Sequence, residues 1–161
     1  MMTQTKPIEG RLLGPALAPV ALLRVSSVLL VGLMAGHMSA YPWASADDPQ
    51  SVQLVRSMKA VAFGFLGERS TYWNLYFGWG LLVGVFLLAM ALVLWLLSDI
   101  APLAPRGVGL ISALVAATSL AGACLAFRYF YLPPFVFFSI LCVLLTVSAW
   151  RLLRQQGPPP L

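Results

Sequence analysis

Four long intervals of this chain contain no Asp, Glu, Lys or Arg. They lie between Arg24 and Asp47, Arg69 and Asp99, Arg106 and Arg128, and Arg128 and Arg151, and hold 22, 29, 21 and 22 residues. A helix needs about 20 mainly apolar residues to cross the hydrocarbon of a bilayer, so each interval can hold one crossing. Residues 83–97 are apolar on every face and lack the two-residue alternation of a barrel strand. The sequence therefore predicts four membrane-spanning helices.

The composition agrees with a lipid solvent. Hydrophobic residues make up 60% of the chain and charged residues 9%, against roughly 25% charged in an ordinary soluble domain. A soluble domain of 161 residues would need many more charged side chains to cover its surface. We therefore predict an all-α, polytopic membrane protein: a four-transmembrane-helix bundle that forms a single membrane domain over residues 1–161, with an amphipathic helix in its first external loop.

The predicted spans are defined by these intervals and their aromatic borders. They cover residues 19–38, 74–98, 108–127 and 132–150. The connections after the second and third spans are short, so the last three spans are expected to be antiparallel neighbours. Flexible tails are expected at residues 1–10, which are polar and lack periodicity, and at 155–161, where a run of proline prevents the last helix from continuing.

The orientation follows from the distribution of Lys and Arg. If the N-terminus is cytoplasmic, the basic residues on that side are Lys6, Arg11, Arg24, Arg106, Arg151 and Arg154, and those on the other side are Arg56, Lys59, Arg69 and Arg128. Cytoplasmic segments of membrane proteins carry an excess of basic residues. We therefore expect both ends to be cytoplasmic and the loop after the first span to be external.

A second interpretation of the N-terminal region stays open. Residues 44–46, Ala-Ser-Ala, have the form that a signal peptidase cuts, and they follow a basic region and an apolar core. Cleavage there would remove residues 1–46 and leave three spans. The preceding apolar run is long enough to cross a membrane, which favours a retained first span.

The external loop contains an amphipathic segment over about residues 49–66. Its apolar residues recur at three- and four-residue steps, which is typical of a helix with one apolar face. They are Leu54, Val55, Met58, Val61, Ala62 and Phe65. Asp48 and Pro49 suit an N-cap and a first helical position, and Gly64 and Gly67 suit the end of the helix. We expect this helix to lie along the membrane surface.

Small residues at four-residue spacing predict close helix packing. They are Gly32 and Gly36 in the first span, Gly80 and Gly84 in the second, and Ala113, Ala117 and Ala121 in the third. Packing within the bundle is the expected role, and a homo-oligomer or a membrane protein partner is the alternative. Cys124 and Cys142 lie inside apolar runs without zinc-site spacing, and whether they pair stays open.

Charged and aromatic residues gather at the outer level of the predicted bundle. The candidate ligand-binding mouth consists of His37, Glu68, Arg69, Trp73, Tyr76 and Arg128. Such a lining could bind a lipid or quinone-like head group, and a His37 and Glu68 pair could move a proton. Charges and aromatic rings at an interface are also ordinary membrane anchors.

The sequence assigns no catalytic residue, metal or cofactor. His37 is the only histidine, and the chain lacks a nucleotide-binding, hydrolase or metalloprotease motif. The net charge is +5, but the basic residues are scattered singly and form no stripe with stacking aromatics. We therefore expect no nucleic acid partner, and anionic lipid head groups as the counter-charge.

The segment that enters the second span carries a family resemblance. Residues 63–88 read FGFLGERSTYWNLYFGWGLLVGVFLL, and Gly36 and His37 end the first span. The match resembles small bacterial integral membrane proteins of uncharacterised four-helix families, loosely DoxX-like in size and span count. The resemblance implies a four-helix bundle in a bacterial inner membrane and supplies no catalytic residues.

The sequence leaves two functional hypotheses. The first is a non-enzymatic accessory or lipid-interacting bundle with membrane lipids as partners. The alternative is a small membrane enzyme or redox partner that acts on a lipid-like or quinone-like substrate at the outer mouth.

Overall fold

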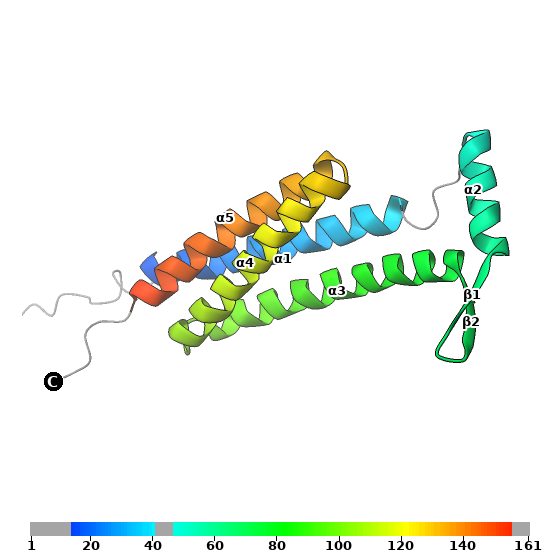
Figure 1. Cartoon of the computed structure of the whole chain (residues 1–161). Helices are drawn as coiled ribbons and strands as arrows, with labels where there is room; N and C mark the ends of the chain where they lie inside the picture. Colours follow the sequence, from blue (N-terminus) through cyan, green and yellow to red (C-terminus); the bar gives the residue numbers. More distant parts are fainter. Residues whose placement is uncertain (1–13, 41–46, 156–161) are drawn as a thin grey trace, which may run out of the picture. The chain divides into compact units, whose positions relative to one another are not determined.

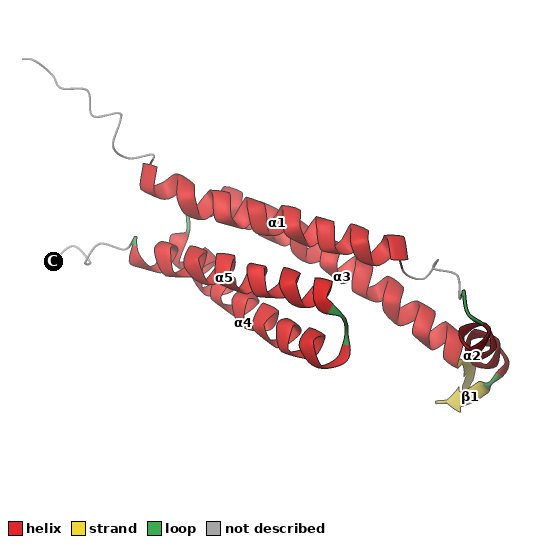
Figure 2. Ribbon diagram, turned by 90° about the horizontal axis from the view of Figure 1, so that it is seen from above, coloured by secondary structure: helices red, strands yellow, loops and turns green. Residues whose placement is uncertain are grey.

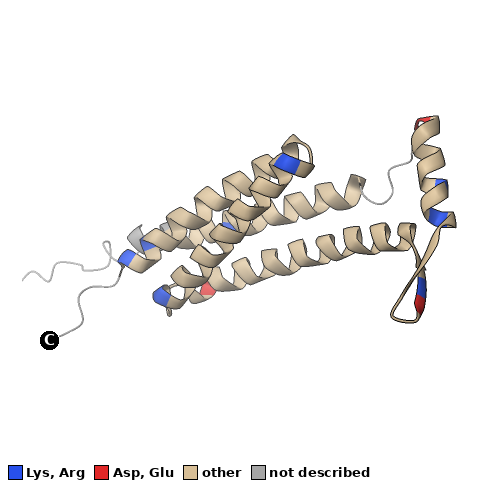
Figure 3. Cartoon of the chain, viewed as in Figure 1, with Lys and Arg blue, Asp and Glu red and all other residues tan. Residues whose placement is uncertain are grey.

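The computed structural model describes residues 14–40 and 47–155. Its four long helices are α1 (Gly14–Ala40), α3 (Tyr72–Ile100), α4 (Pro105–Tyr129) and α5 (Leu132–Arg154) (Figure 1). Each is long and apolar enough to cross a membrane, α1 over Pro19–Ala40. Most of the length of α3, α4 and α5 carries no charged residue (Figure 3). The prediction of an all-α, four-helix, multi-pass membrane protein is confirmed.

The helices are longer than the predicted spans. α1 begins at Gly14 with Pro19 inside it, and α5 continues to Arg154 rather than ending near residue 150. A helix satisfies its own backbone hydrogen bonds, so it need not stop where the hydrocarbon stops. The predicted flexible tails lie outside the described residues, except for Gln155, the C-cap of α5. The Ala-Ser-Ala sequence at residues 44–46 also lies outside them.

The chain divides into two compact units. The first comprises residues 1–30 and 91–161, and the second comprises residues 31–90. α1 and α3 each contribute one part to each unit.

In the first unit, α4 and α5 run side by side (Figures 1 and 2). The buried face of α4 consists mainly of small residues, among them Ser112, Ala116, Ser119 and Ala123. A Cβ atom on Gly109 would lie 3.0 Å from Leu153 Cγ, and one on Gly122 would lie 3.1 Å from Phe138 Cδ1. Side chains of α5 therefore rest directly on the backbone of α4.

The predicted small-residue row of the third span is wrong for packing within the chain. Ala113, Ala117 and Ala121 are exposed. The packed row lies one residue earlier, through Ser112 and Ala116, because the face of a helix that is covered depends on where its neighbour lies.

Hydroxyl groups connect α1 to the other helices of the first unit. Ser27 Oγ donates to the Ala91 carbonyl at 2.7 Å, and Ser148 Oγ donates to the Pro19 carbonyl at 3.4 Å. Both serines are buried. Interhelical hydrogen bonds of this kind contribute about 0.6 kcal/mol each in membrane proteins.

In the second unit, α2 (Pro49–Ala60) begins as predicted. Asp48 is the N-cap and accepts from the Ser51 amide at 2.9 Å, and Pro49 occupies the first helical position. The predicted end near residue 66 is wrong. α2 ends at Ala60, and strands β1 (Ala62–Phe65) and β2 (Glu68–Thr71) follow as an antiparallel hairpin.

The hairpin turns through Leu66 and Gly67. Phe65 pairs with Glu68 across the strands, which leaves a two-residue loop. Both loop residues have positive φ, 52° for Leu66 and 88° for Gly67, as in a type I′ turn. Left-handed backbone costs a residue with a Cβ about 1–2 kcal/mol, so Leu66 is strained.

β2 continues into α3 without an intervening residue. Thr71 Oγ1 accepts from the Asn74 amide at 3.2 Å, so Thr71 is the N-cap. The Phe63 ring lies 5.0 Å from the Tyr72 ring, centroid to centroid. The hairpin is thus fixed to the first turn of a membrane-spanning helix.

Candidate functional site

A shallow groove runs along one side of the first part of α3. Its volume is about 290 Å³, and its lining residues are Ser70, Asn74, Leu75, Gly78, Trp79 and Leu82. Asn74, Gly78 and Leu82 are spaced by four, so they form one row along the helix. We call this feature the α3 groove.

The α3 groove changes from polar to apolar along the helix. Ser70 and Asn74 supply a hydroxyl and an amide at the end where α3 begins. Leu75, Trp79 and Leu82 form apolar walls that are 46%, 61% and 42% exposed. This order of polar and then apolar lining fits an amphiphile, with its head group beside Asn74 and its chain beside Leu82.

Gly78 lies in the middle of this row and keeps it open. A Cβ atom added to Gly78 would have no heavy atom within 4 Å in the described structure. A larger side chain at this position would therefore enter the groove rather than collide with the protein.

Another face of α3 receives the end of α1. His37 Nε2 lies 2.8 Å from the Gly80 carbonyl oxygen, so the ring N–H donates to it. A Cβ atom on Gly84 would lie 2.6 Å from Met38 Sδ, which means that Met38 occupies the space that Gly84 leaves. The two glycines with four-residue spacing thus accommodate consecutive side chains of α1.

Trp73 is the centre of an aromatic cluster in the first turns of α3. Its ring centroid lies 5.9 Å from that of Tyr76 and 6.1 Å from that of Phe77. Lys59 Nζ lies 4.7 Å from the Trp73 ring centroid, a cation–π contact that joins the end of α2 to α3. A positive charge therefore lies at the level where α3 begins.

The predicted pairing of His37 with Glu68 stays a prediction. Glu68 and Arg69 are exposed on the hairpin, on opposite faces because successive strand residues alternate. Gly80, the hydrogen-bond partner of His37, lies eight residues after Tyr72, which is about 12 Å along the axis of α3.

The other predicted site residues lie as follows. Arg128 belongs to the first unit, where its guanidinium carbon lies 5.2 Å from the Tyr129 ring centroid. Its convergence with the other mouth residues stays a prediction. Gly32 and Gly36 are exposed, and a Cβ on Gly36 would have no heavy atom within 4 Å in the described structure. Their packing role also stays a prediction.

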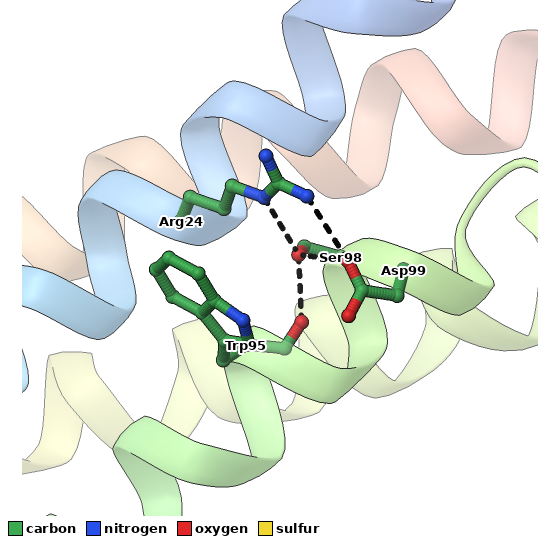
Figure 4. A network of polar contacts seen from close by, with 4 residues as sticks. All are labelled: Arg24, Trp95, Ser98 and Asp99. Atoms are coloured by element: carbon green, nitrogen blue, oxygen red, sulfur yellow. Dashed lines mark hydrogen bonds and ion pairs between the residues drawn. The ribbon is translucent and has the colours of Figure 1, made fainter.

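Arg24 forms a polar network in the first unit that the sequence did not reveal (Figure 4). Its Nη2 lies 3.1 Å from Asp99 Oδ1, and its Nε donates to Ser98 Oγ at 3.3 Å. Ser98 Oγ in turn donates to the Trp95 carbonyl at 2.6 Å. The ion-paired side chains are 49% and 54% exposed. The network connects α1 to the end of α3 at a partly solvated position, and we interpret it as structural.

Metal chemistry has no donor set in the part of the chain that the structure describes. No group of three or more His, Cys, Asp or Glu side chains there could hold a metal ion. Cys124 and Cys142 are free thiols, so the pairing that the sequence left open is not formed.

Comparison with protein-family models, curated proteins and solved structures gave no match. The resemblance to DoxX-like families therefore stays a prediction. Function has to be inferred from the geometry of the α3 groove and the residues around it.

Proposed function

We propose that this chain is a non-enzymatic integral membrane protein that holds a membrane lipid in the α3 groove. The observation that carries the proposal is the change from polar residues, Ser70 at the end of β2 and Asn74 on α3, to the apolar Leu82 further along α3. A membrane lipid has the same order, a polar head group followed by an acyl chain. Because α3 is long and apolar enough to cross the bilayer, its groove opens toward a phase rich in such molecules.

A positive charge near the polar end of the groove favours a phosphate head group. Lys59 lies over the ring of Trp73, the residue before Asn74. Basic side chains at a membrane interface attract anionic head groups. A hydroxyl and an amide beside them add hydrogen-bond donors for phosphate oxygens.

The proposed setting is a bacterial inner membrane with both ends of the chain in the cytoplasm. The excess of Lys and Arg on that side supports this orientation. A reporter fused after Leu161 that is active only in the cytoplasm should give signal. Signal from a reporter that is active only in the periplasm would reverse the orientation and leave the groove at the other face of the membrane.

Lipid binding is tested with a phospholipid that carries a photoreactive diazirine in its acyl chain. The full chain is reconstituted in nanodiscs of phosphatidylethanolamine and phosphatidylglycerol with this probe, extracted, washed and then irradiated. We expect cross-links at Trp79 and Leu82 that survive the wash, because a groove-bound lipid exchanges more slowly than lipids on open helix faces.

Matched glycine variants separate the groove from the general lipid-facing surface. Gly78→Leu fills the groove, whereas Gly36→Leu adds the same side chain at an open position outside it. We expect Gly78→Leu to lose the wash-resistant cross-links and Gly36→Leu to keep them. Equal labelling of the two variants, or no wash-resistant label in the wild-type chain, would overturn the proposal.

The enzymatic alternative is tested in the same nanodiscs. Mass spectrometry measures whether the wild-type chain converts the phospholipid or an added quinone. Conversion that His37→Ala or Glu68→Gln abolishes would overturn the non-enzymatic part of the proposal. Unchanged lipid and quinone pools support it.

A further inference from the structure

The hairpin of the second unit ends in two exposed apolar side chains. Leu66 is 89% exposed and Phe65 is 69% exposed. Leu66 holds this position in a left-handed backbone conformation that Asn, Asp or Gly adopts more readily. In water, an exposed Leu gives no compensation for this strain. These two exposed apolar side chains on a strained turn are therefore suited to insertion into an apolar phase.

The bilayer lies within reach of this tip. β2 has four residues and continues directly into α3, so the tip is about 14 Å of extended strand from the start of a membrane-spanning helix. The hairpin and α2 both run across the axis of α3 (Figure 1), and α2 is seen nearly end-on in Figure 2. An element that crosses the axis of a spanning helix at its end runs along the plane of the membrane.

α2 presents an uncovered face in the same plane. None of its residues is buried, and Leu54, on its apolar face, is 61% exposed. Arg56 and Lys59 lie in its C-terminal half, and Arg69 lies on the hairpin. Apolar side chains flanked by basic ones match the boundary between acyl chains and anionic head groups. Glu68, next to the turn, limits the tip to the interfacial layer, because a carboxylate does not enter hydrocarbon readily.

We propose that Phe65 and Leu66 form a membrane-inserting tip that enters the interfacial layer of the leaflet where α3 begins. The partner is the phospholipid surface itself. Insertion would fix the hairpin, and with it the polar end of the α3 groove, at a constant depth. The proposal rests on the spanning helices alone and stands whether or not the α3 groove holds a lipid.

The depth of the tip is measured with nitroxide labels on single cysteines. The background is Cys124→Ala with Cys142→Ala, reconstituted as the full chain in vesicles of phosphatidylethanolamine and phosphatidylglycerol. Leu66→Cys is compared with Gln53→Cys, an exposed site on the polar side of α2, and with Val85→Cys, which is 63% exposed on α3. Accessibility to oxygen, which concentrates in lipid, is compared with accessibility to a water-soluble nickel complex.

We expect the label at position 66 to be more accessible to oxygen than to the nickel complex, as at position 85, and the label at position 53 to show the reverse. Nickel accessibility at position 66 equal to that at position 53 would overturn the proposal. Shielding of position 66 from both reagents would also overturn it, because that result indicates burial against protein.

A second variant keeps the turn and removes the apolar side chain. Leu66→Asn suits the left-handed position, so the hairpin should remain folded. The nitroxide label is now placed on Phe65→Cys. We expect its accessibility to the nickel complex to be severalfold higher with Leu66→Asn than with Leu66 retained. An unchanged depth in this variant would show that Leu66 does not drive insertion and would overturn its assigned role.

Discussion

His37 donates its Nε2 hydrogen to the Gly80 carbonyl oxygen over 2.8 Å and so connects the end of α1 to α3. A residue of the predicted ligand-binding mouth is thus engaged with the backbone of a neighbouring helix. Gly80 is buried, and the small residue at this position fits a close approach of α1 to α3.

Removal of the imidazole should weaken this connection. His37→Ala is expected to lower the free energy of unfolding in detergent micelles by about 0.6 kcal/mol, and by less than about 1.7 kcal/mol, the range for interhelical hydrogen bonds in membranes. The control is Ser39→Ala, because Ser39 Oγ is exposed and, among the described residues, donates within α1, to the Gly36 carbonyl. Equal losses for the two variants would contradict an interhelical role for His37.

Gly84 should tolerate a larger side chain poorly. A Cβ atom there would lie 2.6 Å from Met38 Sδ, so Gly84→Leu is expected to lower stability relative to Gly36→Leu by about 1–3 kcal/mol. Both changes replace a helical glycine with leucine, so the gain in helix propensity cancels. Met38→Ala should restore part of the loss in a double variant. Thermal unfolding in the same detergent measures all three, and the absence of any rescue would show that Met38 is not the obstructing group.

The ion pair between Arg24 and Asp99 should contribute little. Its two side chains are 49% and 54% exposed, so solvent screens the interaction, and partly exposed pairs couple by about 0.2–1 kcal/mol. A double-mutant cycle with Arg24→Ala and Asp99→Ala, measured by unfolding in nanodiscs, is expected to give a coupling in this range. A coupling of several kcal/mol would mean that the pair is desolvated by lipid or by a partner.

The start of α2 should respond to acid. Hydrogen bonds from Ser51 lower the pKa of the Asp48 carboxyl below its ordinary value of 3.8. The ionised carboxylate therefore stabilises α2 above about pH 4, and this contribution is lost as the pH falls through the lowered pKa. Protection of the Ser51 amide from exchange, measured relative to its intrinsic rate at each pH, should fall over that window in the wild-type chain.

Two substitutions separate the cap from the charge at this position. Asp48→Asn keeps an acceptor oxygen and should remove the pH dependence of this protection, whereas Asp48→Ala should lower the protection at every pH. Asp47→Asn serves as the control and should behave as the wild-type chain does. A pH dependence that survives in Asp48→Asn would assign the titration to another group.

The sequence predicted the start of α2 correctly and its end incorrectly, and the two outcomes have different causes. Asp48 and Pro49 act through local hydrogen bonding and a fixed φ angle, which any chain with these residues shares. The end depended on whether residues 61–65 continue a helix or pair with a strand. Their apolar spacing is compatible with both, and the usual Asn-Gly signal of a two-residue hairpin is replaced by Leu66 and Gly67.

The candidate site, too, was predictable from the sequence only in part. Sequence spacing identified Gly80, Gly84 and His37 as notable residues, but not that His37 and Met38 lie against those two glycines. No spacing pattern distinguishes Gly78 in the sequence, because an open groove along a helix depends on which neighbouring elements leave it uncovered. Only the packed arrangement of the second unit distinguishes the covered row of α3 from the open one.

Hydrophobicity and the absence of charge over long intervals determined that this chain crosses a membrane with four helices, since the cost of burying charge or unpaired backbone in lipid leaves no other solution. The faces that those helices use, the hairpin between α2 and α3, and the hydrogen bond between His37 and Gly80 were decided by tertiary structure. Lipid is as apolar as the side chains themselves, so hydrophobic pattern does not distinguish a helix face that meets protein from one that meets lipid. Close packing and specific hydrogen bonds make that distinction.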